Sequence, residues 1–256
     1  MTESSADHRA RVAAAFGRAA GYAEAAIVQH EAAARLAARI AGLPLPASPA
    51  ILEIGCGTGF LTRALAPAIG PARWTVSDIA PEMVERARAA LDLDADYRLI
   101  DGEAVDPELG PFDLIVSNMA FQWFANLPDA VARLSALLAP GGAIAFSTMA
   151  AGSFAEWAAV LAEEGAAAGT PDYPDRPALF SLVPPGFSGE IELVDFVQAQ
   201  PDARSFLQRL KTIGAATPAP AYRQLSGAVL RRAMARFDAG TRIVTYRLGF
   251  CLFRAQ

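Results

Sequence analysis

Three glycines at alternate positions form the pattern in this 256-residue chain that most clearly suggests chemistry. Gly55, Gly57 and Gly59 follow a short apolar run at residues 50–54 and precede Phe60. Glycines at such a junction permit a tight turn and let a ligand approach the backbone closely. The spacing is G-x-G-x-G and differs from the dinucleotide pattern G-x-G-x-x-G, because position 60 is Phe. This difference disfavours a nicotinamide dehydrogenase.

Acidic and amide side chains follow the next three expected strands. Asp78 ends the second strand, where a carboxylate accepts hydrogen bonds from ribose hydroxyls. Asp101, Gly102 and Glu103 follow the third, where a carboxylate can accept from an adenine amino group. Asn118 ends the fourth. The carboxyl ends of parallel strands share one edge of a sheet, so the series predicts a nucleoside site there. Turn chemistry alone is the alternative for each residue, since Asp, Asn and Gly favour turns.

Strand-like and helical segments alternate along the chain, and they must position these polar residues. Strands are expected at residues 50–54, 74–77, 97–100, 112–117, 143–148, 191–197 and 242–253. Helices are expected at 60–68, 81–91, 129–138, 154–164, 204–213 and 225–237, and residues 6–42 indicate two helices broken near Gly21. Such strand–helix units predict an α/β fold with a mostly parallel sheet covered on both faces.

The overall composition is typical of a globular protein, with 53% hydrophobic and 19% charged residues. A net charge of −5 argues against a general nucleic-acid binder, and no apolar run is long enough for a transmembrane helix. The first residues lack the features of a secretory signal. Cys56 and Cys251 lie in apolar segments, which predicts reduced thiols in a cytoplasmic protein. No Cys/His cluster has the spacing of a metal site.

Positive charge gathers near the end of the chain. Residues 201–256 contain ten basic and two acidic residues, a surplus of eight, so the first 200 residues carry a net −13. This asymmetry predicts a docking face for an anionic partner. The alternative is a solvated helix face in an arginine-rich chain, since 21 of the 22 basic residues are arginine.

The strand ends resemble those of the class I methyltransferase family. Glu53 and the three glycines are similar to its first motif, Asp78 to its ribose-binding acid, and residues 138–142 to the turn before its fifth strand. The resemblance implies S-adenosylmethionine as cofactor and a Rossmann-like seven-stranded sheet in the order 3-2-1-4-5-7-6, with the last strand antiparallel. The expected cofactor-binding residues are Glu53, Gly55, Gly57, Gly59, Asp78, Ile79, Met83, Asp101, Gly102, Glu103 and Asn118.

We expect residues 1–46 to form an N-terminal helical cap and residues 47–256 the methyltransferase domain, with a helical insert at about 202–238. A narrower resemblance, to the biotin-pathway malonyl-acyl-carrier-protein O-methyltransferases, covers nearly the whole chain. The segments that carry it are residues 12–22, 117–123, 210–215 and 244–246. The block from Asn118 to Trp123 also resembles methyltransferases that act on small acids such as trans-aconitate.

The narrower resemblance implies methyl esterification of the free carboxylate of a malonyl thioester, on a carrier protein or on coenzyme A. A carboxylate, with a pKa near 4, is already an ionised nucleophile at neutral pH, so no general base is required. The enzyme must supply orientation, exclusion of water and a polar grip on the carboxylate. We assign this task to Tyr22, Gln122 and Trp123. For Trp123, a role as a core aromatic is the alternative.

Further residues are candidates for contacts with the substrate or its carrier. They are Arg18, Lys211, Arg231, Arg232, Arg236 and Tyr246. Arg18 is the one for which a salt bridge on the cap competes with a substrate contact. Arg232 and Arg236 lie one turn apart on an expected helix and would meet an acidic carrier protein.

Two rival functions remain open from the sequence. One is a carboxyl methyltransferase for a small free acid such as trans-aconitate. The other is a protein that binds S-adenosylmethionine without catalysis and acts as an interaction partner. The sequence leaves open the preference between carrier protein and coenzyme A, and also the oligomeric state.

Overall fold

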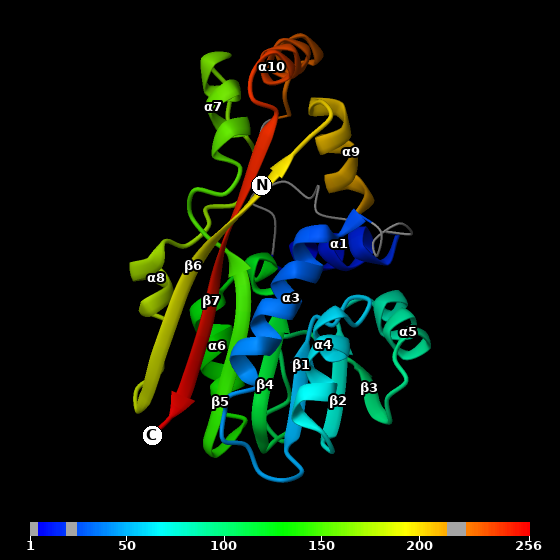
Figure 1. Ribbon diagram of the computed structural model, residues 1–256, viewed down its shortest axis with the longest axis vertical. Helices are drawn as coiled ribbons and strands as arrows, with labels where there is room; N and C mark the ends of the chain where they lie inside the picture. Colours follow the sequence, from blue (N-terminus) through cyan, green and yellow to red (C-terminus); the bar gives the residue numbers. More distant parts are fainter. Residues whose placement is uncertain (1–4, 19–24, 214–223) are drawn as a thin grey trace.

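A mixed β-sheet crosses the molecule (Figure 1). The computed structural model describes residues 5–18, 25–213 and 224–256, and seven strands run through these residues. They are β1 (Ala50–Ile54), β2 (Arg73–Asp78), β3 (Ala95–Leu99), β4 (Phe112–Asn118), β5 (Leu138–Met149), β6 (Phe187–Ala199) and β7 (Ile243–Ala255). Their order is β3-β2-β1-β4-β5-β7-β6, and β7 runs antiparallel to both of its neighbours. The expected α/β fold and strand order are confirmed.

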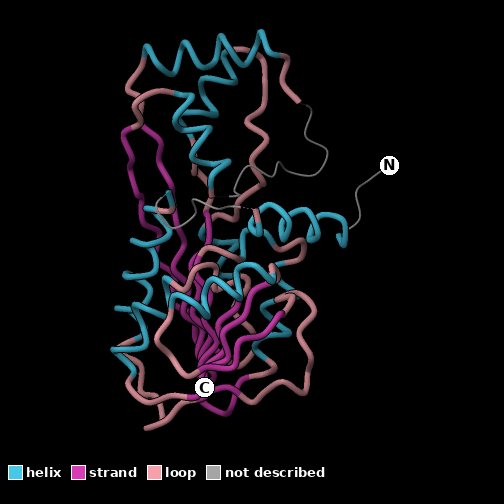
Figure 2. Tube along the Cα trace, turned by 90° about the vertical axis from the view of Figure 1, so that its right-hand side faces the viewer, coloured by secondary structure: helices cyan, strands magenta, loops and turns pink. Residues whose placement is uncertain are grey.

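Helices connect the strands and lie on both sides of the sheet (Figure 2). They are α1 (Ser5–Gly17), α3 (Ile27–Ile40), α4 (Phe60–Ile69), α5 (Pro81–Ala90), the 3-10 turn η1 (Phe121–Trp123), α6 (Leu127–Ser135), α7 (Ala155–Glu163), α8 (Arg176–Phe180), α9 (Ala203–Thr212) and α10 (Gly227–Ala239). The expected break near Gly21 lies outside the described residues.

Neighbouring residues of the central strands enter two different hydrophobic clusters, one on each face of the sheet. On β4, Leu114 and Val116 join the cluster that contains α3 and α4, whereas Ile115 joins the cluster that contains α6 and α8. Side chains alternate between faces along a strand, so an uninterrupted apolar strand means that both faces are covered. Helices therefore cover both faces of the sheet, which leaves the carboxyl ends of its parallel strands open to a ligand.

The last two strands are longer than the rest and carry a separate group of helices. β6 and β7 have 13 residues each and extend beyond the other strands toward α7, α9 and α10 (Figure 1). The aromatic rings of Trp157 of α7, Phe206 of α9 and Phe237 of α10 pack against one another there. Within the range 202–238 the structure has α9 and α10, with residues 214–223 outside the described part of the chain. That this range is an insert stays a prediction.

One predicted helix, at 129–138, has different ends in the structure. α6 begins at Leu127, because the Asn126 side chain accepts from the amide of Asp129 at 3.2 Å and caps the first turn. It ends at Ser135, because Leu138 pairs with Phe112 and already belongs to β5. The proline and glycines after Leu138 thus lie in the irregular start of a strand, which local propensity alone would not indicate.

Of the two N-terminal helices, α3 shares the main core, whereas Phe16 of α1 packs against a small cluster of Ala80 and Met83. Leu36 of α3 lies in the same cluster as Ile51 of β1 and Leu65 of α4. The division between residues 46 and 47 stays a prediction. Among the described helices, none is both long and apolar enough to cross a bilayer.

We predict that Phe146→Ala destabilises the fold by about 3–5 kcal/mol, since it leaves a cavity in the core. Phe146 is fully buried, and its ring lies 4.6 Å from that of Phe121 and 5.5 Å from that of Phe253. Urea unfolding measures the change. The control is Phe180→Ala at a residue that is 56% exposed, and equal losses for the two variants would contradict the assignment of the core.

Candidate active site

The glycine turn after β1 has a backbone that other residues would not adopt without strain. Gly55, Gly57 and Gly59 all have positive φ angles, of 71°, 54° and 82°. A Cβ on Gly55 would lie 2.4 Å from the Cβ of Ala120, and a Cβ on Gly59 would lie 2.9 Å from the Leu91 side chain. The spacing of the glycines is therefore required by both conformation and close packing.

Asp78, at the end of β2, is tied to this turn. Its Oδ2 accepts from the amide of Gly57 and its Oδ1 from the amide of Ala80, both at 2.9 Å. Burial raises the pKa of Asp78, and the backbone hydrogen bonds oppose that rise. A carboxylate oxygen accepts more than one hydrogen bond, so Asp78 can still bind two hydroxyls of a sugar.

Asp101 and Glu103 follow β3 and meet an arginine from the N-terminal helix. Arg9 Nε lies 2.9 Å from Asp101 Oδ2, and Asp101 Oδ1 accepts from the amide of Glu103 at 3.0 Å. Between the two acids, a Cβ on Gly102 would lie 2.6 Å from the ring of Phe124. The Arg9 ion pairs thus hold α1 over the strand ends and offset part of the negative charge of Asp101 and Glu103.

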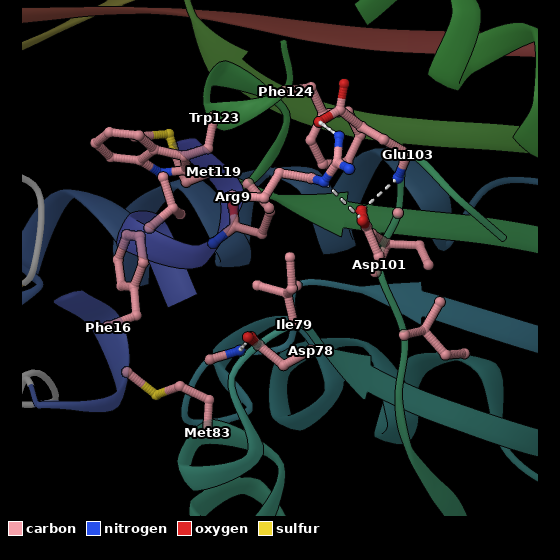
Figure 3. A pocket seen from close by; sticks show the side chains of 18 residues that line it. Arg9, Phe16, Asp78, Ile79, Met83, Asp101, Glu103, Met119, Trp123 and Phe124 are labelled. Carbon is pink, nitrogen blue, oxygen red and sulfur yellow. Dashed lines mark hydrogen bonds and ion pairs between the residues drawn. The ribbon is translucent and has the colours of Figure 1, made fainter. Parts of the chain in front are cut away.

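These groups surround a pocket with about 670 Å³ of empty space, part of it open to solvent. In Figure 3, Phe16 and Trp123 lie at one end, Asp101 and Phe124 at the other, and Asp78 between them. The lining residues are Arg9, Val12, Phe16, Ile54, Gly55, Gly57, Asp78, Ile79, Met83, Ile100, Asp101, Gly102, Glu103, Asn118, Met119, Ala120, Trp123 and Phe124.

The lining fits S-adenosylmethionine. Asp78 suits the ribose, Asp101 and the Phe124 ring suit the adenine, and the glycine turn leaves the backbone exposed to the ligand. Nine of the eleven residues that we expected to bind the cofactor line this pocket. The remaining two, Glu53 and Gly59, are not in the lining and instead support the turn from beneath.

Asn118 lines the pocket, but its side chain also holds two elements together. Its Nδ2 donates to the carbonyl of Gln29 on α3 at 2.9 Å, and its Oδ1 accepts from Ser147 on β5 at 2.7 Å. The next residue, Met119, has a φ of 57° and donates its amide to Ser147 Oγ. Asn118 therefore fixes α3 over the strand ends.

A second pocket, of about 440 Å³, adjoins the first and shares Phe16, Met119 and Trp123 with it. The rings of Phe16 and Trp123 meet edge to face at 5.5 Å and stand between the two pockets. The lining residues of the second pocket are Phe16, Gln29, Met119, Gln122, Trp123, Met149, Phe154, Tyr173, Leu210, Ile213 and Tyr246. None of these described residues carries a charge.

The residues that we assigned to the acceptor are only partly brought together. Trp123 lines both pockets, and its buried Nε1 has no hydrogen-bond partner among the described residues. Gln122 lines the second pocket and donates to the Met119 carbonyl at 2.6 Å. Tyr22 lies outside the described residues, and Arg18 is exposed and lines neither pocket.

The candidates for substrate or carrier contacts near the end of the chain separate into two groups. Tyr246 is buried in the second pocket, whereas Lys211, Arg231, Arg232 and Arg236 are exposed on α9 and α10. Glu164, after α7, holds two of them, with Arg232 Nε at 2.5 Å and Arg236 Nε at 2.6 Å. The predicted docking charge is thus partly neutralised within the chain.

Sequence reasoning missed several residues that line the pockets. Arg9, Phe124 and Tyr173 lie in helices or loops far along the chain from the glycine turn, and Gln29 contributed to the family resemblance but was not assigned to the site. No local pattern distinguishes them, because their place in the site depends on contacts such as Arg9 with Asp101, 92 residues apart in sequence. Phe16 lies in a segment that carried the family resemblance, but its type alone indicated a core residue.

Glu53 generates a prediction about pH, because burial raises its pKa from 4.5 to about 8. Because the folded protein holds the proton of Glu53 more tightly than the unfolded chain does, protonation of Glu53 stabilises the fold. This stabilisation is complete below pH 4.5 and is lost as the pH rises toward 8. We expect the unfolding free energy of the wild type to fall relative to Glu53→Gln between these values, by up to about 4 kcal/mol. Urea unfolding at several pH values measures it, and parallel profiles would refute the assignment.

Comparisons with known proteins agree with this geometry. A family model described as a methyltransferase domain matches residues 51–142. The chain is 44% identical over 233 residues to the biotin biosynthesis bifunctional protein BioCD of Bordetella avium, and the match spans 91% of this chain and half of that protein. It is 40% identical over 243 residues to the malonyl-[acyl-carrier protein] O-methyltransferase of Magnetococcus marinus, spanning 93% and 90% of the two chains.

Solved structures support the fold alone. The YcgJ protein of Bacillus subtilis has a TM-score of 0.60 at 13% identity, with 86% of this chain and 97% of that chain covered. The plantazolicin methyltransferase BpumL, solved with SAH, has a TM-score of 0.54 at 13% identity, with 97% and 95% covered. The sequence relatives and the family model establish the family: the chain belongs to the malonyl-[acyl-carrier protein] O-methyltransferase family of S-adenosylmethionine-dependent methyltransferases.

Proposed function

We propose that this chain transfers the methyl group of S-adenosylmethionine to the free carboxylate of a malonyl thioester on an acyl carrier protein, in biotin synthesis. The observation that carries the proposal is the uncharged second pocket, which meets the cofactor pocket at Trp123. The names of the relatives supply the acceptor and the pathway. A methyl ester masks the carboxylate charge, so that fatty-acid enzymes can extend the chain.

The second pocket suits a nucleophile that needs no base. Its described lining holds no His, Asp, Glu or Lys, and a carboxylate is ionised at neutral pH. The polar residues that line it are all neutral, namely Gln29, Gln122, Trp123, Tyr173 and Tyr246. The acceptor charge disperses as the methyl bond forms, so a strong ion pair would stabilise the ground state more than the transition state. Neutral donors orient the carboxylate without that penalty.

The N-terminal helix excludes water from the meeting point of the pockets. Arg86 Nη2 donates to the Gly17 carbonyl at 2.7 Å at one end of α1, and Arg9 contacts Asp101 near the other. Phe16 is thereby held against Trp123. When bound, the cofactor supplies an electrophilic methyl group, and Asp78, Asp101 and the glycine turn are the groups that would hold it.

The direct test is to incubate the protein with labelled S-adenosylmethionine and malonyl-carrier protein, and to look for the methyl ester by mass spectrometry. We expect label on the malonyl group and little on trans-aconitate. Asp78→Ala should lose cofactor affinity by about tenfold or more, because two ribose hydrogen bonds to a charged group are removed. Label on trans-aconitate alone would contradict the proposed acceptor, and unchanged cofactor affinity would contradict the role of Asp78.

We propose further that the exposed basic residues on α9 and α10 meet the acidic carrier protein. Lys211 and Arg231 have no ion-pair partner among the described residues, whereas Arg232 and Arg236 are held by Glu164. Charge reversal at the two unpaired residues therefore tests docking without breaking the α7–α10 contact.

Lys211→Glu with Arg231→Glu should raise the KM for malonyl-carrier protein about tenfold at low salt and leave cofactor affinity unchanged. The matched control is Arg98→Glu with Arg133→Glu, two exposed arginines on β3 and α6. Steady-state kinetics at two salt concentrations make the measurement. Equal KM values for the wild type and the docking variant would exclude this face.

The remaining expectations concern location and partners. We propose a cytoplasmic protein that binds neither nucleic acid nor membrane, on the basis of the net charge of −5 and of two buried cysteines that are both free.

A further inference from the structure

Two tyrosines line the second pocket with hydroxyl groups that have no hydrogen-bond partner among the described residues. They are Tyr173, in the loop between α7 and α8, and Tyr246, on β7. Both side chains line this pocket, so their hydroxyls are available to donate to a ligand bound in it.

Both tyrosines lie at the outer end of the pocket, away from the cofactor. Ser147 of β5, which bonds to Met119 beside the cofactor pocket, pairs with Phe250 of β7. Tyr246 lies four residues from Phe250 along β7, in the part that extends beyond β5. At about 3.3 Å per residue, its backbone is roughly 13 Å from that of Phe250. The loop of Tyr173 reaches the same level, because the carbonyl of Pro174 accepts from the amide of Ala151 at 2.9 Å.

The outer end offers neutral donors only. Burial raises the pKa of Tyr246 to about 12 and raises that of Tyr173 further, so both keep their protons near neutral pH. Arg209 acts electrostatically on Tyr246, but it donates to Gln198 at 3.1 Å and lines a separate groove. Because the described lining itself holds no cation, burying a second carboxylate at this end is costly, whereas the hydroxyls would satisfy a carbonyl oxygen.

We propose that Tyr173 and Tyr246 donate hydrogen bonds to the thioester carbonyl of the acceptor, whose carboxylate lies at the Trp123 end; this inference rests on the proposed function. The pocket thereby recognises a carboxylate and a neutral carbonyl together. The tyrosines are specificity determinants that distinguish an acyl thioester from a free diacid.

The experiment compares two acceptors on the same carrier protein. One carries malonyl thioester, and the other carries a 2-carboxyethyl thioether, in which a methylene replaces the thioester carbonyl. We expect the wild type to prefer the malonyl form by about tenfold or more in kcat/KM, and the double variant Tyr173→Phe with Tyr246→Phe to reduce that preference at least about fivefold. In the double variant, kcat/KM should decrease with the malonyl form and stay nearly unchanged with the thioether.

The matched control is Tyr97→Phe, whose hydroxyl donates to the Leu93 carbonyl at 3.4 Å outside both pockets. Cofactor affinity and thermal melting verify the fold of each variant. An unchanged preference in the double variant overturns the inference. If that variant fails to fold, the wild type decides, since equal kcat/KM for the two acceptors also overturns it. No methyl transfer to either acceptor by the wild type would instead refute the proposed function itself.

Discussion

The close approach of β1 to β4 at their carboxyl ends is the constraint on which the site depends. It is possible only because Gly55 has no Cβ, which would otherwise lie 2.4 Å from that of Ala120. The amide of Gly57 then points at Asp78 and holds the ends of β1 and β2 together. Cofactor lining, acid placement and the position of η1 all follow from this junction, since Ala120 immediately precedes Phe121, Gln122 and Trp123.

The two pockets differ in the charge of the residues that line them. The carboxylates of Asp78, Asp101 and Glu103 line the cofactor pocket, and Arg9 pairs with the last two. Such a pocket suits a ligand with hydroxyl and amino donors and a positive sulfur. The acceptor pocket is uncharged in its described lining and offers N–H and O–H donors instead. An anion enters such a pocket without a cation to hold it there, so its nucleophilicity is preserved. The boundary at Phe16 and Trp123 is where the two environments meet.

Elements that lie beyond the strand ends form part of the wall of the second pocket. The long β6–β7 pair carries α9 and α10 above the strand ends. Leu210 of α9 and Ile213, just after it, line the acceptor pocket. On the outer surface, Glu164 binds Arg232 and Arg236 and so fixes α10 against α7. The same helices therefore supply apolar walls inside and positive charge outside, an arrangement that fits an acceptor delivered by an anionic carrier.

The sequence by itself determined the α/β alternation, the glycine turn and the acids at the strand ends. Each of these depends on the backbone preferences of a few neighbouring residues, such as the positive φ angles of Gly55, Gly57 and Gly59. The cofactor and family followed from the resemblance of those same local segments. Only the tertiary structure decided that Arg9 meets Asp101, that Glu164 neutralises two of the predicted docking arginines, and that Tyr173 joins Tyr246 in the acceptor pocket. These contacts join segments that are remote in sequence, and their energies come from packing and burial that no local pattern records.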